Sequence, residues 1–77
     1  MEQIYMPKLS DNMKSGTLVS WVKQVGDTVK KGDVLFEVET DKVVYEVEAT
    51  SDGHLASQCW EEGDVVASGE TVAVIGK

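Results

Sequence analysis

The chain has 77 residues, of which 42% are hydrophobic and 27% are charged, with a formal net charge of −7 and no arginine. This length allows one small domain and leaves no room for a second, catalytic one. The negative charge disfavours nucleic acid and anionic membranes, which bind basic surfaces, so a charged partner is expected to be basic. Because the chain has no arginine, it lacks a guanidinium group that could bind phosphate through two hydrogen bonds, and tight binding of a free nucleotide is not expected.

No segment has the pattern of a membrane span or a signal peptide. No apolar run approaches the roughly 18 residues that a span needs, and Met1-Glu2-Gln3 lacks a basic start before an apolar stretch. The single cysteine, Cys59, cannot form an internal disulfide. We therefore expect a soluble domain of a reducing compartment, with Cys59 buried as a packing residue.

Short β-strands are predicted along the whole chain. Apolar residues alternate over 18–22, 34–38, 43–47, 55–59 and 72–74, and no stretch supports a helix longer than a turn. Gly-Asp pairs at 26–27, 32–33 and 63–64 mark tight turns between these segments. The pattern favours an all-β sandwich or flattened barrel.

The two halves of the chain repeat one pattern. A shift of 37 residues pairs six of the seven glycines: Gly16 with Gly53, Gly26 with Gly63, and Gly32 with Gly69. Since glycine marks special backbone conformations, the halves are expected to share a backbone path and to pack face to face about a pseudo-two-fold axis. The same shift maps 43–49 onto 6–12 and the preceding strand onto 71–76, so both chain ends should lie opposite the central hairpin.

That central hairpin has a strongly specified register. With Asp41 and Lys42 as a two-residue turn, one face of the hairpin becomes continuously apolar, and a slip of one residue would mix the faces. The apolar pairs are Thr40 with Val43, Val38 with Tyr45, Phe36 with Val47, and Val34 with Ala49. The other face pairs Glu39 with Val44, Glu37 with Glu46, and Leu35 with Glu48.

Lys42 is the candidate functional residue. Hairpin turns favour glycine or asparagine, so Asp41-Lys42 is a poor choice for turn stability alone, and its position suggests a lysine displayed for covalent use. Beside it lie four carboxylates, called here the acidic face: Glu37, Glu39, Glu46 and Glu48. This face is either a solvated surface or a recognition surface for enzymes that act on Lys42.

With these residues in view, the chain resembles the lipoyl domain of the dihydrolipoamide acyltransferase component of a 2-oxo acid or acetoin dehydrogenase complex. The order and spacing of several short motifs carry the resemblance, and they span almost the whole chain. These motifs are Met6-Pro7-Lys8-Leu9-Ser10, Val25-Gly26-Asp27, Lys31-Gly32-Asp33-Val34-Leu35, Glu39-Thr40-Asp41-Lys42, Asp52-Gly53 and Glu62-Gly63-Asp64. Val43 departs from the alanine that often follows the acceptor lysine in this family.

The resemblance implies a flattened barrel of two four-stranded antiparallel sheets, with lipoate in amide linkage to Lys42. It implies recognition roles for Glu39, Thr40, Asp41 and Val43, and no catalytic residue in this domain. The implied partners are a lipoate-attaching ligase or transferase, a thiamine diphosphate-dependent decarboxylase, the acyltransferase catalytic domain and dihydrolipoamide dehydrogenase. Residues 1–77 would be one lipoyl domain, an N-terminal part of a longer acyltransferase, in bacterial cytoplasm or the mitochondrial matrix.

Two other interpretations remain open. A biotinyl carrier domain resembles the same fold with a lysine at the same hairpin, although Asp41 and Val43 replace its flanking methionines. An unmodified binding or linker module would use the acidic face to dock a basic partner. His54 lacks a convincing nucleophile for a triad, and His54 and Cys59 are too few for a zinc site, so neither an enzyme nor a metal site is predicted.

Overall fold

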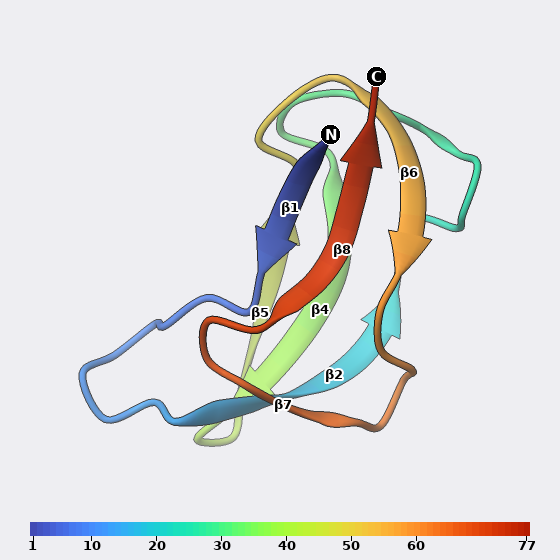
Figure 1. Ribbon diagram of the computed structural model, residues 1–77. Helices are drawn as coiled ribbons and strands as arrows, with labels where there is room; N and C mark the ends of the chain where they lie inside the picture. The colour runs from blue at the N-terminus through green and yellow to red at the C-terminus, as the bar shows by residue number, and fades with distance from the viewer.

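Eight short strands form two facing sheets in the computed structural model, which describes all 77 residues (Figure 1). Their order is β1-β8-β6-β3 in one sheet and β5-β4-β2-β7 in the other, and every pairing is antiparallel. The strands are β1 (Glu2–Tyr5), β2 (Ser15–Trp21), β3 (Thr28–Val29), β4 (Val34–Thr40), β5 (Val43–Glu48), β6 (Gly53–Gln58), β7 (Val65–Ala67) and β8 (Thr71–Gly76). The expected all-β architecture of two four-stranded sheets is confirmed. No helix that could cross a membrane is present.

The inward faces of the two sheets form one apolar core. Phe36 is fully buried in this core, and the ring of Trp21 meets the Phe36 ring edge-on with centroids 5.1 Å apart. Burial of a side chain of this size contributes about 1.5–3 kcal/mol. The core consists of Ile4, Met6, Met13, Leu18, Val29, Leu35, Phe36, Val38, Ala49, Leu55, Val66, Val72, Ala73 and Ile75.

Hydrogen bonds between the two halves follow the predicted pseudo-two-fold symmetry. The Leu18 amide donates to the Asp64 carbonyl oxygen at 2.9 Å, and the equivalent Leu55 amide donates to the Asp27 carbonyl oxygen at 3.0 Å. The turns that precede Asp27 and Asp64 also have the same backbone conformation, because Gly26 and Gly63 have φ of 96° and 95°. A positive φ at this turn position favours glycine, which explains why the glycines repeat.

The first strand does not follow the 37-residue shift, and the prediction that 43–49 maps onto 6–12 is wrong. The Ala49 amide donates to the Asp33 carbonyl oxygen, and the equivalent bond runs from Met6 to Glu70, both at 2.8 Å. Ala49 therefore corresponds to Met6, a shift of 43. Residues 7–12 are an insertion in the β1–β2 connection, and β1 lies before it. The insertion precedes Gly16, so the glycine spacing gives no sign of it.

A β-bulge changes the far end of the central hairpin. The predicted register holds from Thr40 opposite Val43 to Phe36 opposite Val47, but beyond it Val34 lies opposite Glu48 rather than Ala49. A bulge sets two residues against one and so redirects a side chain. Leu35 is consequently fully buried, which corrects its expected place on the acidic side of the hairpin.

Cys59 also departs from expectation. Strand β6 ends at Gln58, so Cys59 falls in the connection that follows and is exposed rather than buried. Its amide still donates to the Val72 carbonyl oxygen at 2.8 Å, which ties the connection to β8.

The chain ends lie at one end of the molecule and the β4–β5 turn at the other. Strands β1 and β8 run side by side, with Glu2 opposite Ile75, so the termini meet at the top of Figure 1. The β4–β5 turn lies at the bottom of the same view. This confirms the expected separation between the turn and both termini.

Candidate functional site

The β4–β5 turn has an unusual backbone conformation. Asp41 has a φ of 50° and Lys42 a φ of 65°, and every other residue with positive φ is a glycine. Positive φ at both central residues is the pattern of a type I′ turn, whose twist matches that of the flanking strands. The tight turn gives Lys42 a defined position at the end of the hairpin.

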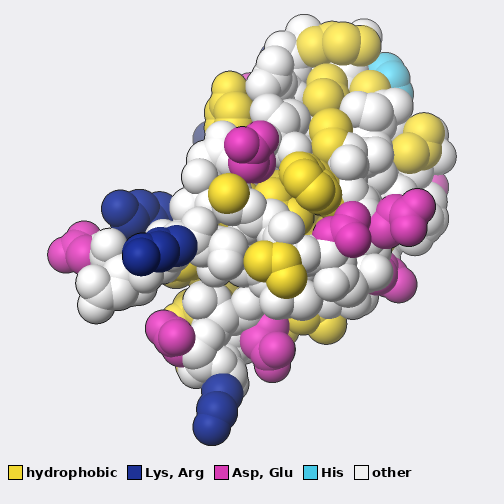
Figure 2. Space-filling view, turned by 60° about the horizontal axis from the view of Figure 1, so that its bottom comes forward, with side chains coloured by type: hydrophobic (Ala, Val, Ile, Leu, Met, Phe, Trp, Pro, Cys, Tyr) yellow, Lys and Arg dark blue, Asp and Glu magenta, His cyan; other side chains and the backbone are white.

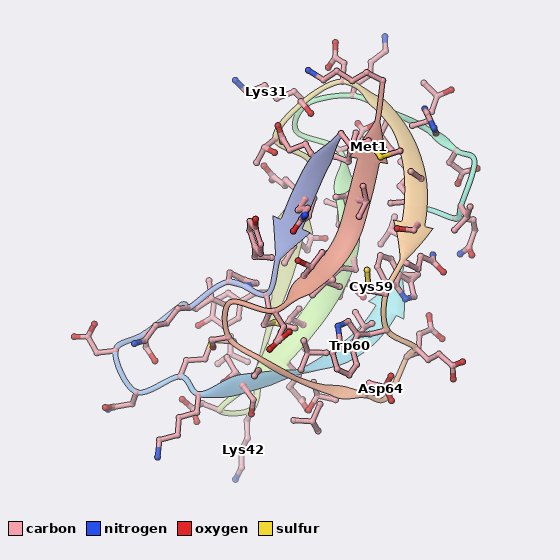
Figure 3. All side chains as sticks on the ribbon, viewed as in Figure 1. Met1, Lys31, Lys42, Cys59, Trp60 and Asp64 are labelled. Carbon is pink, nitrogen blue, oxygen red and sulfur yellow. The ribbon has the colours of Figure 1, made fainter.

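The side chain of Lys42 extends into solvent. It points away from the body of the domain at the end opposite Met1 (Figure 3). No hydrogen bond engages its amine, and the one ion pair in the structure joins Lys23 Nζ to Asp33 Oδ2 at 3.6 Å. The Lys42 amine is therefore free to be approached by a large partner.

The hairpin that supports the turn is anchored in the core. Strand β4 is central in its sheet and pairs with both β2 and β5. Its residues Leu35, Phe36 and Val38 are fully buried. Strand β5 is an edge strand and is mostly exposed, with Tyr45 at 38%. Strand β4 is thus fixed by packing in the core, and β5 is held to β4 by the backbone hydrogen bonds between the two strands.

The four residues predicted to be recognised beside Lys42 all lie at this end of the hairpin. Asp41 is in the turn and exposed, and Val43 is 46% exposed. Glu39 is exposed, whereas Thr40, which faces Val43 across the hairpin, is half-buried. The structure brings all four together around Lys42.

The carboxylates are distributed unequally between the pseudo-equivalent sheets. Strands β4 and β5 contain all four residues of the acidic face, while the other sheet has a single strand carboxylate, Glu2, and no strand contains a lysine. Glu37 lies directly opposite Glu46, and the Ser20 hydroxyl donates to Glu37 Oε1 at 2.7 Å. Figure 2, which brings the end with the β4–β5 turn forward, shows acidic and hydrophobic side chains side by side.

A row of residues across the sheet extends from the turn, and sequence reasoning missed part of it. Val44 lies opposite Glu39, Glu39 opposite Thr17, and Thr17 opposite Val65. Val44 and Val65 are 51% and 64% exposed. No local pattern signals Thr17 or Val65, because their places beside Glu39 depend on pairings between distant strands.

These features define a small two-sheet domain that displays one lysine on a hairpin turn. The comparisons with known proteins agree with that class. A family model described as "Biotin-requiring enzyme", named Biotin_lipoyl, matches residues 2–75. The chain belongs to the Biotin_lipoyl family.

Dihydrolipoyllysine-residue acyltransferases are among the sequence relatives of this chain. All 77 residues align at 42% identity with 18% of the succinyltransferase component of the 2-oxoglutarate dehydrogenase complex from Staphylococcus saprophyticus. They also align at 42% identity with 17% of the dihydrolipoyllysine-residue acetyltransferase component 5 of the chloroplastic pyruvate dehydrogenase complex from Arabidopsis thaliana. The chain thus spans less than a fifth of these relatives.

Two solved structures share the fold. The lipoyl domain of the 2-oxoglutarate dehydrogenase complex from Azotobacter vinelandii matches with a TM-score of 0.82 and 36% identity, covering 100% of this chain and 98% of that one. The urea carboxylase of Kluyveromyces lactis matches with a TM-score of 0.77 and 29% identity, covering 99% of this chain and 7% of that one. The resemblance to a lipoyl domain is confirmed over the whole chain.

Proposed function

We propose that Lys42 is the attachment point for lipoate and that this domain carries the lipoyl group between the active sites of a 2-oxo acid dehydrogenase complex. The observation that supports this most directly is the free amine of Lys42 on a type I′ turn of two non-glycine residues. The choice of lipoate as the attached group rests on the similarity of this chain to lipoyl domains.

The residues at the turn fit an amide-linked group. An exposed amine without hydrogen-bonding or ionic partners loses no interaction when it is acylated. The lipoyl dithiolane supplies the acyl-transfer and electron-transfer chemistry, while the domain supplies position and partner choice. The turn fixes where the arm begins, and the buried part of β4 keeps that point rigid.

Asp41 and Val43 flank the acceptor and present a small distinctive surface to the attaching enzyme. Glu39 adds a carboxylate on the outer face, and Thr40 closes the last pair before the turn. These four residues select the enzyme that modifies Lys42, and none of them performs chemistry. The acidic face extends this surface toward basic partners.

The parent chain is an acyltransferase with further domains, by analogy with relatives more than five times as long. Its partners are the thiamine diphosphate-dependent decarboxylase, the acyltransferase catalytic domain and dihydrolipoamide dehydrogenase. A tether between domains raises the effective concentration of the arm to the order of mM for short linkers. The compartment is the cytoplasm if the source is a bacterium and the mitochondrial matrix if it is a eukaryote; among the relatives, two Arabidopsis thaliana proteins are named as mitochondrial and chloroplastic.

The test is the mass of the intact domain after reaction with lipoate and a lipoate ligase, and in parallel with biotin and a biotin ligase. We expect one lipoyl group per chain, no biotin, and no lipoyl group on the Lys42→Arg variant. A biotinylated product would replace the lipoyl assignment by the biotinyl one. A wild-type domain that stays unmodified in both reactions would favour the unmodified binding module.

A further inference from the structure

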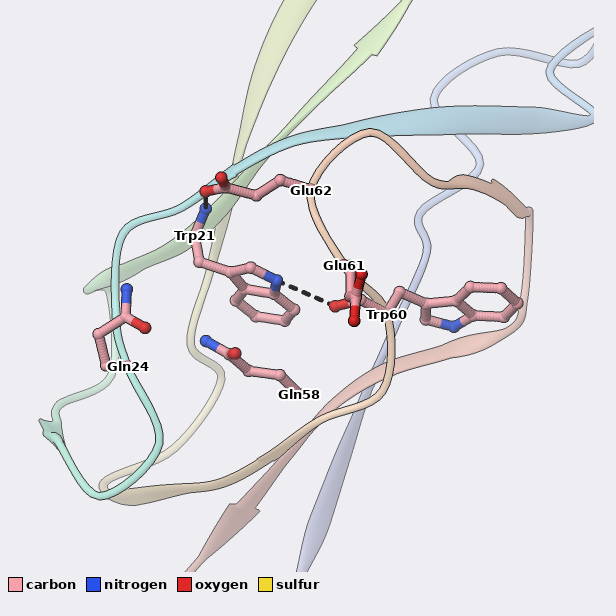
Figure 4. Close-up of a pocket in the computed structure, with 6 residues that line it drawn as sticks. All are labelled: Trp21, Gln24, Gln58, Trp60, Glu61 and Glu62. Carbon is pink, nitrogen blue, oxygen red and sulfur yellow. Dashed lines mark hydrogen bonds between the residues drawn. The ribbon is translucent and has the colours of Figure 1, made fainter.

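The groove beside Trp21 is built from hydrogen bonds that join the two halves of the chain. It lies between the β2–β3 and β6–β7 connections (Figure 4). Trp21 Nε1 donates to the Trp60 carbonyl oxygen at 3.1 Å, and Gln58 Nε2 donates to the Lys23 carbonyl oxygen at 3.0 Å. Both tryptophans pack against the core, and the Trp60 ring points away from the opening. The groove therefore serves the fold, and the unpartnered groups of this domain lie along the edge of a sheet instead.

Strand β5 is the longest edge strand of the domain. The sheet order places β1, β3, β5 and β7 at the edges, and these strands contain four, two, six and three residues. Short strands and β-bulges protect an edge from pairing with another chain. β3 and β7 are short, and β1 has a bulge between Ile4 and Tyr5. The pairing of β5 with β4 is regular from Val43 to Val47, so β5 can accept a further strand.

The backbone of β5 has hydrogen-bonding groups that point away from β4. Hydrogen-bonded and non-hydrogen-bonded pairs alternate along an antiparallel ladder, and the two-residue turn makes Thr40 and Val43 a hydrogen-bonded pair. The Ala49 amide, which donates to the Asp33 carbonyl oxygen at 2.8 Å, fixes the same alternation at the other end of the strand. The residues between these bonded positions, whose N–H and C=O groups point outward, are called here the open edge. They are Val44, Glu46 and Glu48.

The side chains of β5 determine which strand complements the open edge. On the outer face, Glu46 and Glu48 are exposed carboxylates, and no strand of the domain contains a lysine to balance them. On the opposite face of β5, Val43 and Tyr45 are exposed apolar side chains. A complementary strand therefore carries basic side chains opposite the two glutamates and apolar side chains at the alternate positions.

The same carboxylates exclude a second copy of this chain as the partner. Two β5 strands side by side would bring four glutamates together, in domains that each have a net charge of −7. Within the domain, Glu46 already lies directly opposite Glu37, an arrangement that lowers the stability of a sheet. A basic partner strand would relieve this repulsion.

We propose that the open edge pairs with an extended basic strand of the enzyme that attaches lipoate to Lys42. This inference rests on the proposed function. The first residue of β5, Val43, directly follows Lys42, so a strand added beside β5 holds the enzyme next to the acceptor amine. In this mode of recognition, main-chain hydrogen bonds provide affinity and side chains at alternate positions provide specificity. The pairing also fixes the position of the hairpin relative to the enzyme.

The first test is amide hydrogen exchange of the ¹⁵N-labelled domain, alone and with saturating lipoate ligase in the absence of lipoate. We expect the amides of Val44, Glu46 and Glu48 to exchange about tenfold more slowly with the ligase, because each gains a hydrogen bond. The Gln3 amide of β1, which corresponds to Glu46 under the shift of 43, is the internal control and should not change. Protection of β1 rather than β5, or an open edge that stays unprotected, would overturn the proposal.

The second test uses proline variants in lipoylation kinetics. Glu46→Pro removes an outward N–H but no bond to β4, and proline is tolerated at such positions of edge strands. We expect it to raise the KM of the ligase for the domain about tenfold, and Glu46→Gln, which keeps the N–H, to raise it about threefold. Gln3→Pro makes the equivalent change on β1 and should leave the KM unchanged.

Backbone spectra verify that each variant is folded. Equal KM values for the two proline variants, or a wild-type KM for Glu46→Pro, would contradict the pairing while leaving lipoylation of Lys42 intact. A wild-type domain that takes no lipoyl group would instead overturn the proposed function and, with it, this inference.

Discussion

Asp41 and Lys42 are consecutive residues in the left-handed backbone region, with φ of 50° and 65°, at the end of the β4–β5 hairpin. For residues with a Cβ, this conformation costs about 1–2 kcal/mol each. The other turns with positive φ, such as those at Gly26 and Gly63, use glycine. The strain is thus concentrated at the lysine that we propose to be modified, as expected when function rather than stability selects the residue.

The first prediction concerns this strain. Lys42→Gly should raise the free energy of unfolding by about 0.5–1 kcal/mol, because glycine adopts positive φ without a Cβ clash, and part of the gain is offset in the unfolded chain. Lys42→Ala keeps the Cβ and should unfold within about 0.5 kcal/mol of the wild type. Urea denaturation measures both variants. Equal stability of the glycine and alanine variants would contradict the strained turn.

The second prediction concerns the like-charged pair of Glu37 and Glu46. Glu46→Gln should raise the free energy of unfolding by about 0.2–1 kcal/mol, since like charges directly opposite each other destabilise a sheet. Added salt should diminish the gain. Glu48→Gln removes the same charge from the same strand opposite Val34, so it is the matched control and should have a smaller effect. An equal gain in both would assign the effect to net charge alone.

The third prediction concerns the close packing of Gly16 against β4. A Cβ on Gly16 would lie 2.6 Å from Val38 Cγ1 and 3.0 Å from Met13 Cε. Gly16→Ala should therefore destabilise the domain by about 1–3 kcal/mol, as overpacked cores do. In a Val38→Ala background the same change should cost clearly less, because the clashing methyl group is gone. A double-mutant cycle by thermal or urea unfolding gives the coupling, and simple additivity would exclude direct contact.

The fourth prediction concerns the pH dependence of stability at Asp33. The Lys30 amide, which donates to Asp33 Oδ2 at 2.9 Å, lowers the pKa of this carboxyl from 3.8, and the Lys23 ammonium acts in the same direction. A lowered pKa means that the stabilisation is present above the unfolded pKa and is lost as pH falls through the folded pKa.

Asp33→Asn should accordingly be less stable than the wild type at neutral pH. The difference in urea midpoint should shrink as pH falls below 3.8, where the wild-type carboxyl becomes protonated. A difference that stays constant down to strong acid would show that charge at this position has no role.

Much of the hairpin could be predicted from the sequence, because a two-residue turn and a period of two leave one register that keeps the apolar side chains together. This register places Lys42 at the turn and Glu37 opposite Glu46, as observed. It fails at Leu35, where a bulge redirects the side chain and no local pattern announces the extra residue.

The remaining differences arise where strands are short or contacts are distant. β3 and β7 have two and three residues, too few to show a period. The insertion at 7–12 leaves no mark in the glycine spacing, so a uniform 37-residue shift predicts the first strand later in the chain than its observed position, Glu2–Tyr5. The groove between Trp21 and Trp60 depends on hydrogen bonds between residues far apart in the chain, and only the folded structure reveals them.

Lys42 is one of seven lysines, and peptide mapping of the lipoylated domain by tandem mass spectrometry identifies which of them carries the lipoyl group. We expect a single lipoyl group on the peptide that contains Lys42, with the other six lysines unmodified. A lipoyl group on Lys14, Lys31 or any other lysine while Lys42 stays free would contradict it.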